Sequence, residues 1–228
     1  MSEKPILFNT EMVRANLDGR KSCTRRLVKF LPGESPQWTG YIKDGLMLYN
    51  GKNEQCIRKA PYQPGDVLYV RETWAWCPCW DCMEDAVQGR CEYGEHRIYH
   101  DGKKEHGCYM YRASCKDNEY PAADTWHPSI HMPKDAARIW LKVTEVRVER
   151  LQEITEDGAI LEGAIDNRGF IHAPDDEYNT IHSAKEHFID IWNYTIKKLD
   201  FDRYGWDANP WVWVIAFEPC EKPSDKEN

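Results

Sequence analysis

The sequence lacks any apolar run close to the roughly 20 residues that a membrane-spanning helix needs. It also lacks internal repeats and the composition of disordered or collagen-like chains, since 41% of its residues are hydrophobic. The first ten residues, MSEKPILFNT, hold no positively charged segment followed by a long apolar stretch, so no export signal is predicted. We therefore expect a globular protein of the cytoplasm with no membrane partner.

Positive charge is also in deficit, because 30 Lys and Arg against 38 Asp and Glu leave a formal net charge of −8. Broad, sequence-independent binding of nucleic acids depends on many cations that neutralise phosphates, so the composition argues against it. The cations that are present gather near the N-terminus, where residues 1–30 hold seven Lys and Arg. Residues 151–190 are acidic in contrast. A site that attracts an anion is therefore expected near the N-terminal cluster.

Aromatic residues and cysteines are abundant, with ten Trp and nine Cys among 228 residues. A chain of this length can bury a core without disulfide bonds, and without an export signal reduced thiols or a metal site are favoured. Four cysteines follow the pattern C-x-C-x₂-C-x₈-C, and they are Cys77, Cys79, Cys82 and Cys91. A Cys-x₂-Cys turn supplies two of the four ligands that zinc binds tetrahedrally. No second Cys-x₂-Cys follows, so the alternatives are a structural zinc site and a set of free thiols.

The local patterns predict short strands and short helices. Strands are predicted over 5–8, 67–70, 109–112, 138–150 and 211–217, with a hairpin around 41–49. Helices are predicted behind an N-cap at Asn9 or Thr10 and before a stop at Gly19, from Thr155 to Gly163, and behind the capping box of Ser183 and Glu186. The predicted fold is α+β: a small mixed or antiparallel sheet, curled into a barrel, with the short helices packed on it.

Several segments resemble the ASCH domain, a PUA-like β-barrel family in which a helix ends in a Lys-containing turn that leads to an Arg. These segments are 17–26 (LDGRKSCTRR), 64–74 (PGDVLYVRETW), 128–133 (PSIHMP) and 204–213 (YGWDANPWVW). They are similar to a phage and prophage subgroup, encoded in bacterial hosts. The resemblance implies one ASCH domain over residues 1–220, with insertions at about 31–63 and at about 75–107, the second of them Cys-rich. Residues 221–228 are expected to be a disordered polar tail.

Small ASCH proteins include amidohydrolases that remove the acetyl group from N4-acetylcytidine. By motif, their catalytic set corresponds to Lys21, Thr24 and Glu162. An amide needs a nucleophile, a base for the proton of the nucleophile, and an acid for the departing amine. The hydroxyl of Thr24 can attack, a neutral Lys21 can accept its proton, and Glu162 can protonate the leaving nitrogen. On an extended strand, Lys21 and Thr24 would face opposite sides, so this mechanism requires a turn there.

Further residues are candidates for binding the substrate, and they are Arg20, Arg25, Arg26, Glu72, Trp74, Trp126, His131 and Trp206. The arginines can hold an oxyanion or can be solvated charges at a helix C-terminus. Indole rings can stack on a base or pack in the core, and the core is favoured for Trp211 and Trp213. His131 is either a substrate partner or a buried histidine.

The leading hypothesis is hydrolysis of an N-acylated cytidine or related modified nucleoside, without a catalytic cofactor. The alternatives are recognition of single-stranded RNA or a nucleobase without chemistry, and ribonuclease activity. Binding that weakens steeply with salt would favour the alternatives.

Overall fold

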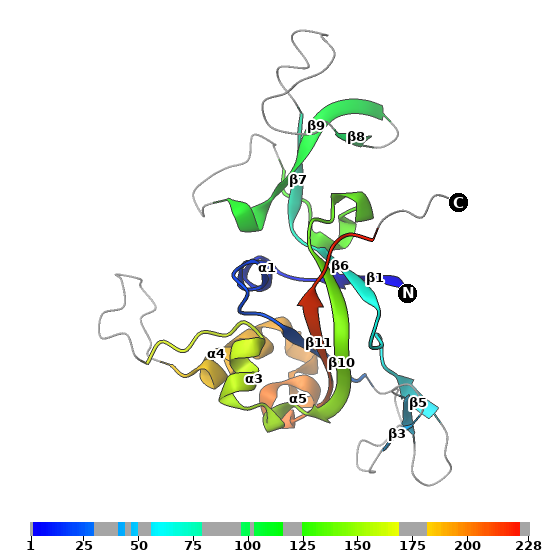
Figure 1. Ribbon diagram of the computed structural model, residues 1–228. Coiled ribbons are helices and arrows are strands. Elements are labelled where there is room, and N and C mark those ends of the chain that lie inside the picture. The colour runs from blue at the N-terminus through cyan, green and yellow to red at the C-terminus, as the bar shows by residue number, and fades with distance from the viewer. Residues whose placement is uncertain are drawn as a thin grey trace. The chain divides into compact units, whose positions relative to one another are not determined.

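The computed structural model describes residues 2–29, 41–43, 47–49, 56–78, 97–100, 103–115, 125–168 and 182–223. It is a mixed α+β protein, as predicted (Figure 1). The chain forms two compact units, which we describe separately. Unit 1 comprises residues 1–4, 15–68 and 141–228, and unit 2 comprises residues 5–14 and 69–140.

The largest sheet has five strands in the order β1-β6-β10-β11-β2. The strands are β1 (Glu3–Leu7), β6 (Val67–Arg71), β10 (Trp140–Arg150), β11 (Trp211–Pro219) and β2 (Cys23–Leu27). β11 lies antiparallel between β10 and β2, and Ile215 pairs with Thr24 in its register with β2. The apolar run of β11 is almost entirely buried, with Val214 and Ile215 fully so.

Two three-stranded sheets occupy the regions expected to be insertions. One, in unit 1, has the order β3-β4-β5, with β3 (Tyr41–Lys43), β4 (Met47–Tyr49) and β5 (Cys56–Lys59). The predicted hairpin around 41–49 is confirmed, since Tyr41 pairs with Tyr49. The other, in unit 2, has the order β7-β9-β8, with β7 (Trp74–Pro78), β9 (Lys103–Tyr111) and β8 (Arg97–His100). The local sequence patterns predict only the end of β9.

The helices begin where capping residues predict them. They are α1 (Thr10–Leu17), α3 (Glu156–Leu161), α4 (Ala184–Thr195) and α5 (Phe201–Tyr204). Asn9 caps α1 through a bond to the Met12 N–H, and Thr155 caps α3 through the Gly158 N–H. Ser183 and Glu186 form the predicted capping box of α4. No helix among these described residues is long and apolar enough to cross a membrane.

Six short 3₁₀ segments complete the described elements. They are η1 (Arg112–Ser114), η2 (Ser129–His131), η3 (Lys134–Ala136), η4 (Leu151–Glu153), η5 (Lys198–Asp200) and η6 (Trp206–Ala208).

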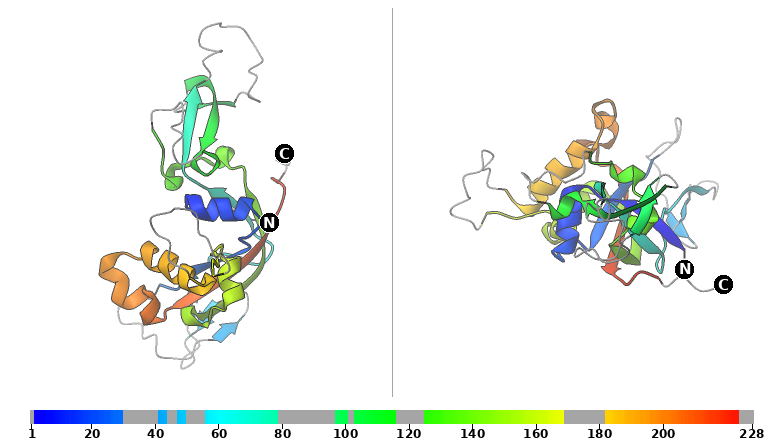
Figure 2. Two further views of the ribbon diagram at one scale, coloured as in Figure 1. Left: turned by 90° about the vertical axis from the view of Figure 1, so that its left-hand side faces the viewer. Right: turned by 90° about the horizontal axis from the view of Figure 1, so that it is seen from above.

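The core of unit 1 lies where α3 and α4 pack against β11 (Figures 1 and 2). Phe188 and Trp192 of α4 belong to the same buried cluster as Val212 and Val214 of β11. Trp213 is also buried, as predicted, whereas Trp211 is half-buried with Arg150 over its ring, 4.2 Å from the centroid. This packing holds the C-terminal end of α3 beside β2.

Candidate functional site

Both α1 and α3 end in a Schellman motif, and the two ends meet within unit 1. At the end of α1, the N–H groups of Gly19 and Arg20 bind the carbonyls of Asn16 and Ala15. At the end of α3, Gly163 plays the same part, and its N–H binds the carbonyl of Ile160. Gly163 has a φ of +98°, and a Cβ there would lie 2.8 Å from the Cβ of Ala15. Only glycine fits this approach of the two turns.

Three consecutive residues after α1 satisfy three consecutive carbonyls at the end of α3. The Ser22 N–H donates to the oxygen of Leu161, and Nζ of Lys21 donates to the oxygen of Glu162. The Arg20 guanidinium donates to the oxygen of Gly163 at 3.0 Å. Helix C-termini leave such carbonyls unpaired and favour nearby cations. The predicted basic turn therefore has a structural role, and that role fixes the position of Glu162.

The Lys21 ammonium is fully buried and has an oxygen acceptor for each of its three protons. Nζ lies 2.8 Å from the carbonyl oxygen of Cys23, 2.7 Å from that of Glu162, and 2.9 Å from Oε2 of Glu162. An ammonium donates three hydrogen bonds and accepts none. This geometry therefore holds Lys21 as a charged group, paired with Glu162.

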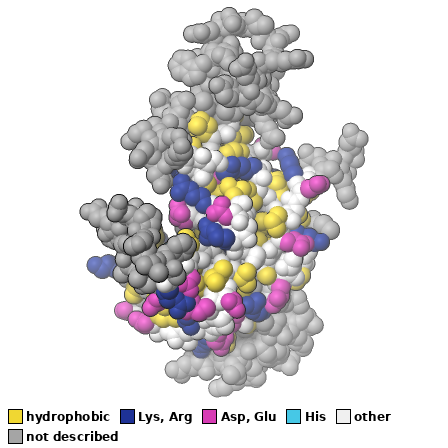
Figure 3. Space-filling model, turned by 60° about the vertical axis from the view of Figure 1, so that its left-hand side comes forward, with side chains coloured by type: hydrophobic (Ala, Val, Ile, Leu, Met, Phe, Trp, Pro, Cys, Tyr) yellow, Lys and Arg dark blue, Asp and Glu magenta, His cyan; other side chains and the backbone are white. Residues whose placement is uncertain are grey.

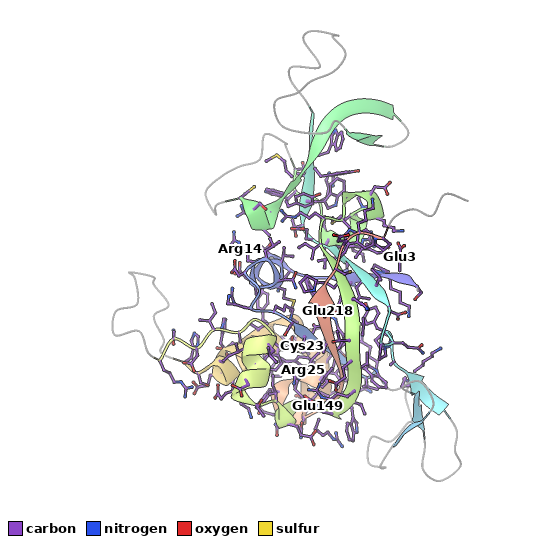
Figure 4. All side chains as sticks on the ribbon, in the orientation of Figure 1. Glu3, Arg14, Cys23, Arg25, Glu149 and Glu218 are labelled. Atoms are coloured by element: carbon purple, nitrogen blue, oxygen red, sulfur yellow. The ribbon has the colours of Figure 1, made fainter. Side chains whose placement is uncertain are left out.

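Arg25 adds a second cation and connects Glu162 to a second carboxylate. Its Nη1 lies 3.1 Å from Oε1 of Glu162, while Nε and Nη2 lie 2.9 and 2.6 Å from Oε1 of Glu149. Figure 4 shows Arg25 beside Glu149, with Cys23 next along β2. Burial lowers the pKa of Arg25, but the two carboxylates raise it more, so the net shift is upward.

Cys23, inside the predicted motif, is not a reactive thiol. Burial and the charge of Glu162 raise its pKa to about 12, although Arg25 and Lys21 act in the opposite direction. Its Sγ lies 3.9 Å from Nη1 of Arg25. A thiol with this pKa stays protonated at neutral pH, which argues against Cys23 as a nucleophile.

Thr24 lies in strand β2, on the opposite face from Cys23 and Arg25. Successive residues of a strand alternate between its two faces, and the contact of Arg25 with Cys23 identifies their common side. Thr24 is 1% exposed, and its Oγ1 has no hydrogen-bond partner. Lys21 and Ser22 precede strand β2, but the strand begins at Cys23 and includes Thr24, so Thr24 does not lie in the turn that the mechanism requires. Thr24 Oγ1 is not hydrogen-bonded to Lys21. Its hydroxyl is therefore both buried and without a hydrogen-bond partner.

Two other predicted residues also lie in unit 1. Arg26 shares the face of Thr24, and burial lowers its pKa although Glu162 and Tyr62 raise it. Trp206 begins η6 and packs edge-on against Phe188, whose ring lies 5.9 Å from the Arg25 guanidinium. Trp206 thus supports the packing behind Arg25 rather than contacting Lys21.

Four predicted residues lie in unit 2, and three of them have side-chain partners there. Glu72 is buried and binds Arg138 through both oxygens, at 2.9 and 3.0 Å. Trp74 is 2% exposed and stacks on His127 with 4.8 Å between ring centroids. Trp126 lies 5.8 Å from the Arg112 guanidinium. His131 is exposed, which excludes its being a buried histidine.

The predicted zinc ligands lie largely outside the described residues. Cys79, Cys82 and Cys91 are outside, and only the backbone of Cys77 is described, in β7. Cys77 pairs with Cys108 of β9 in register. Within the described ranges, no group of three or more His, Cys, Asp or Glu could hold a metal ion. The structural zinc site stays a prediction.

Glu149 is the residue of this cluster that the sequence analysis missed. Its strand alternates between apolar and charged residues, which is typical of an exposed charged face. Three β10 side chains of that kind, Glu145, Arg147 and Glu149, form a chain of ion pairs. Only the register of β10, β11 and β2 shows that Glu149 meets Arg25. A local pattern carries no signal for that meeting.

The fold and the cluster define an α+β protein in which two buried cations are balanced by two carboxylates. The cations are Lys21 and Arg25, and the carboxylates are Glu149 and Glu162. On the face drawn in Figure 3, acidic and basic side chains lie interspersed. Comparison of the chain with family models, curated proteins and solved structures finds no match.

Proposed function

We propose that the chain is a cytoplasmic ASCH-domain protein of the phage type, with a PUA-like barrel, that hydrolyses an N-acylated cytidine or a related modified nucleoside. The observation that supports the proposal is the contact between Lys21 and Glu162. These residues are 141 positions apart in the sequence, yet Nζ lies 2.9 Å from Oε2. Both positions match the catalytic set that the ASCH resemblance implies.

The buried ion pair can supply both the base and the acid of this reaction. Transfer of one proton from Nζ of Lys21 to Oε2 of Glu162 gives a neutral amine and a carboxylic acid. This step requires Thr24 Oγ1, which lies on the other face of β2 and is not bonded to Lys21 in the free protein, to reach Nζ when the substrate is bound. The amine then accepts the proton of Oγ1 as the oxygen attacks the acyl carbon. The carboxylic acid protonates the departing cytosine nitrogen, and water later hydrolyses the acyl-threonine ester.

The second candidate function is recognition of a nucleobase or single-stranded RNA without chemistry. Two observations favour it: every proton of Lys21 has an acceptor, and Thr24 Oγ1 is not bonded to Lys21. Catalytic hydrogen bonds often form only when the substrate is bound, so the hydrolase remains the leading proposal.

The test is incubation of the protein and its variant Thr24→Val with N4-acetylcytidine, followed by chromatography for cytidine. Valine keeps the shape of threonine and removes only a hydroxyl that has no partner. We expect activity to fall at least about a hundredfold. Stability should stay equal or rise, because an unsatisfied buried hydroxyl costs about 1–3 kcal/mol. Ser22→Ala, which removes a hydroxyl from the adjoining turn, is the control and should keep its activity.

Full activity in Thr24→Val would exclude Thr24 as the nucleophile and so overturn the mechanism. An inactive native protein that binds the nucleoside or single-stranded RNA would establish the recognition function instead. Cleavage of RNA without deacetylation would establish a ribonuclease.

A further inference from the structure

A chain of alternating charges runs inward through unit 1 to Lys21. Its members, from the surface, are Arg147, Glu149, Arg25, Glu162 and Lys21. Their side chains are 45%, 13%, 3%, 6% and 0% exposed. Each member pairs with the next within 3.2 Å. This chain of ion pairs therefore connects Lys21 and Glu162, which carry the proposed chemistry, to strand β10.

Glu149 determines which nitrogens of Arg25 are left for Glu162. One oxygen of Glu149, Oε1, accepts both Nε and Nη2 of Arg25, and Oε2 accepts Nε of Arg147. A guanidinium is a rigid planar fork, so binding two of its nitrogens fixes the direction of the third. Of the two oxygens of Glu162, Nη1 of Arg25 then binds Oε1, and Oε2 is left to bind Nζ of Lys21.

We propose that Glu149 is a positioning residue, which acts through Arg25 to keep Oε2 of Glu162 available for proton exchange with Lys21. This inference rests on the proposed function. Without the carboxylate of Glu149, Arg25 can turn and bind Glu162 through two nitrogens, as guanidinium groups bind carboxylates elsewhere. Arg25 would then compete with Lys21 for Oε2.

The variant Glu149→Gln tests this role, with Glu145→Gln as a matched control. Glu145 lies on the same strand and pairs with the same Arg147, at 3.3 Å, but it is 59% exposed and takes no part in the chain to Arg25. We expect Glu149→Gln to lower kcat at least tenfold with KM within twofold. Removal of its negative charge should also move both limbs of the pH profile of kcat to lower pH. Glu145→Gln should match the native protein, and Glu149→Asp should restore most of kcat.

A second measurement is independent of hydrolysis. The Nε–H of Arg25, assigned with Arg25→Lys, should exchange with water at least tenfold faster in Glu149→Gln than in Glu145→Gln, as measured by NMR. If the native protein is inactive, the proposed function fails, and this exchange rate alone decides whether Glu149 holds Arg25. If Glu149→Gln folds and equals Glu145→Gln in kcat, pH profile and exchange rate, the inference is overturned.

Discussion

Each of the two units contains a buried glutamate paired with arginine, and the two arrangements differ. In unit 2, Glu72 is 1% exposed and binds two nitrogens of one guanidinium, that of Arg138. Arg138 in turn lies 4.0 Å from the ring centroid of Tyr111 and donates to Ser114. This pair uses both oxygens of Glu72 on a single partner. In unit 1, Glu162 divides its two oxygens between Lys21 and Arg25.

The difference teaches that burial of a charge does not by itself indicate chemistry. Glu72 and Arg138 neutralise one another's charge, so a structural role accounts for both residues. Glu162 instead occupies the C-cap of α3, where a carboxylate is disfavoured by the helix dipole. Two cations compensate for it there, one of which already binds carbonyl groups. A neutral residue would end the helix at lower cost, so the carboxylate itself calls for a functional explanation.

The largest expected effect comes from removing the cation of each pair in turn. Arg138→Met leaves Glu72 buried without its cation, and the loss of stability should be about 3–5 kcal/mol. Arg25→Met leaves Glu149 with Arg147 and Glu162 with Lys21, so the loss should be smaller, about 1–3 kcal/mol. Urea unfolding at pH 7 measures both.

The loss of deacetylation activity should follow the opposite order. Arg25→Met should lose more activity than Arg138→Met, because Arg25 contacts Glu162 and Arg138 does not. If Arg25→Met is the more destabilised variant, the proposed contrast is wrong between Glu72, which has one cationic partner, and Glu162, which shares two.

The sequence predicts the helix ends of unit 1 well, because their determinants are local. Gly19, Thr155 and the box of Ser183 and Glu186 act within four residues of the positions that they fix. The apolar run that forms β11 is similarly evident. The expectation that Lys21 and Glu162 work together came from the ASCH resemblance, because no local pattern joins residues so far apart.

The contacts among the buried charged side chains depend on pairings between distant segments, which a local sequence pattern does not contain. Arg25 and Arg26 are adjacent and chemically equal, and only the register of β2 decides which one faces Glu162. The same holds for Glu72, whose partner Arg138 lies 66 residues away. Thr24 illustrates the remaining difficulty, since strand β2 begins at Cys23 and so includes Thr24, which the proposed mechanism requires in the preceding turn.

The second prediction tests whether the close approach of the two helix ends belongs to the site. Gly163→Ala places a methyl group 2.8 Å from the Cβ of Ala15 at a φ of +98°, so we expect a loss of about 2–4 kcal/mol and lower activity. Gly65 is the control, because its φ is +88° but nothing lies within 4 Å of an added Cβ. Gly65→Ala should lose about 1 kcal/mol and keep its activity. Equal losses in denaturant unfolding would show that the contact with Ala15 contributes nothing.

The smallest expected effect is a pH dependence that unit 1 owes to His187. Its Nδ1 accepts the N–H of Ile165 at 2.9 Å, just beyond Gly163, so the ring is held neutral. Burial and the nearby His182, with a smaller effect of Arg20, lower the pKa of His187, although Asp190 raises it. Stability from this group is therefore complete above the unfolded pKa of about 6.5 and declines as the pH falls towards the folded value. The segment after Glu162 should loosen in that range.

The variant His187→Asn isolates this effect, because the asparagine Oδ1 can accept the Ile165 N–H but does not titrate. Urea midpoints measured between pH 8 and pH 5 should fall less in His187→Asn than in the native protein. The two curves should converge above pH 7, where both side chains are neutral acceptors. Parallel curves over the whole range would mean that carboxylates, and not His187, govern the acid limb. The bond to Ile165 would then be a static support of the α3 terminus, equivalent to the Glu72–Arg138 pair of unit 2.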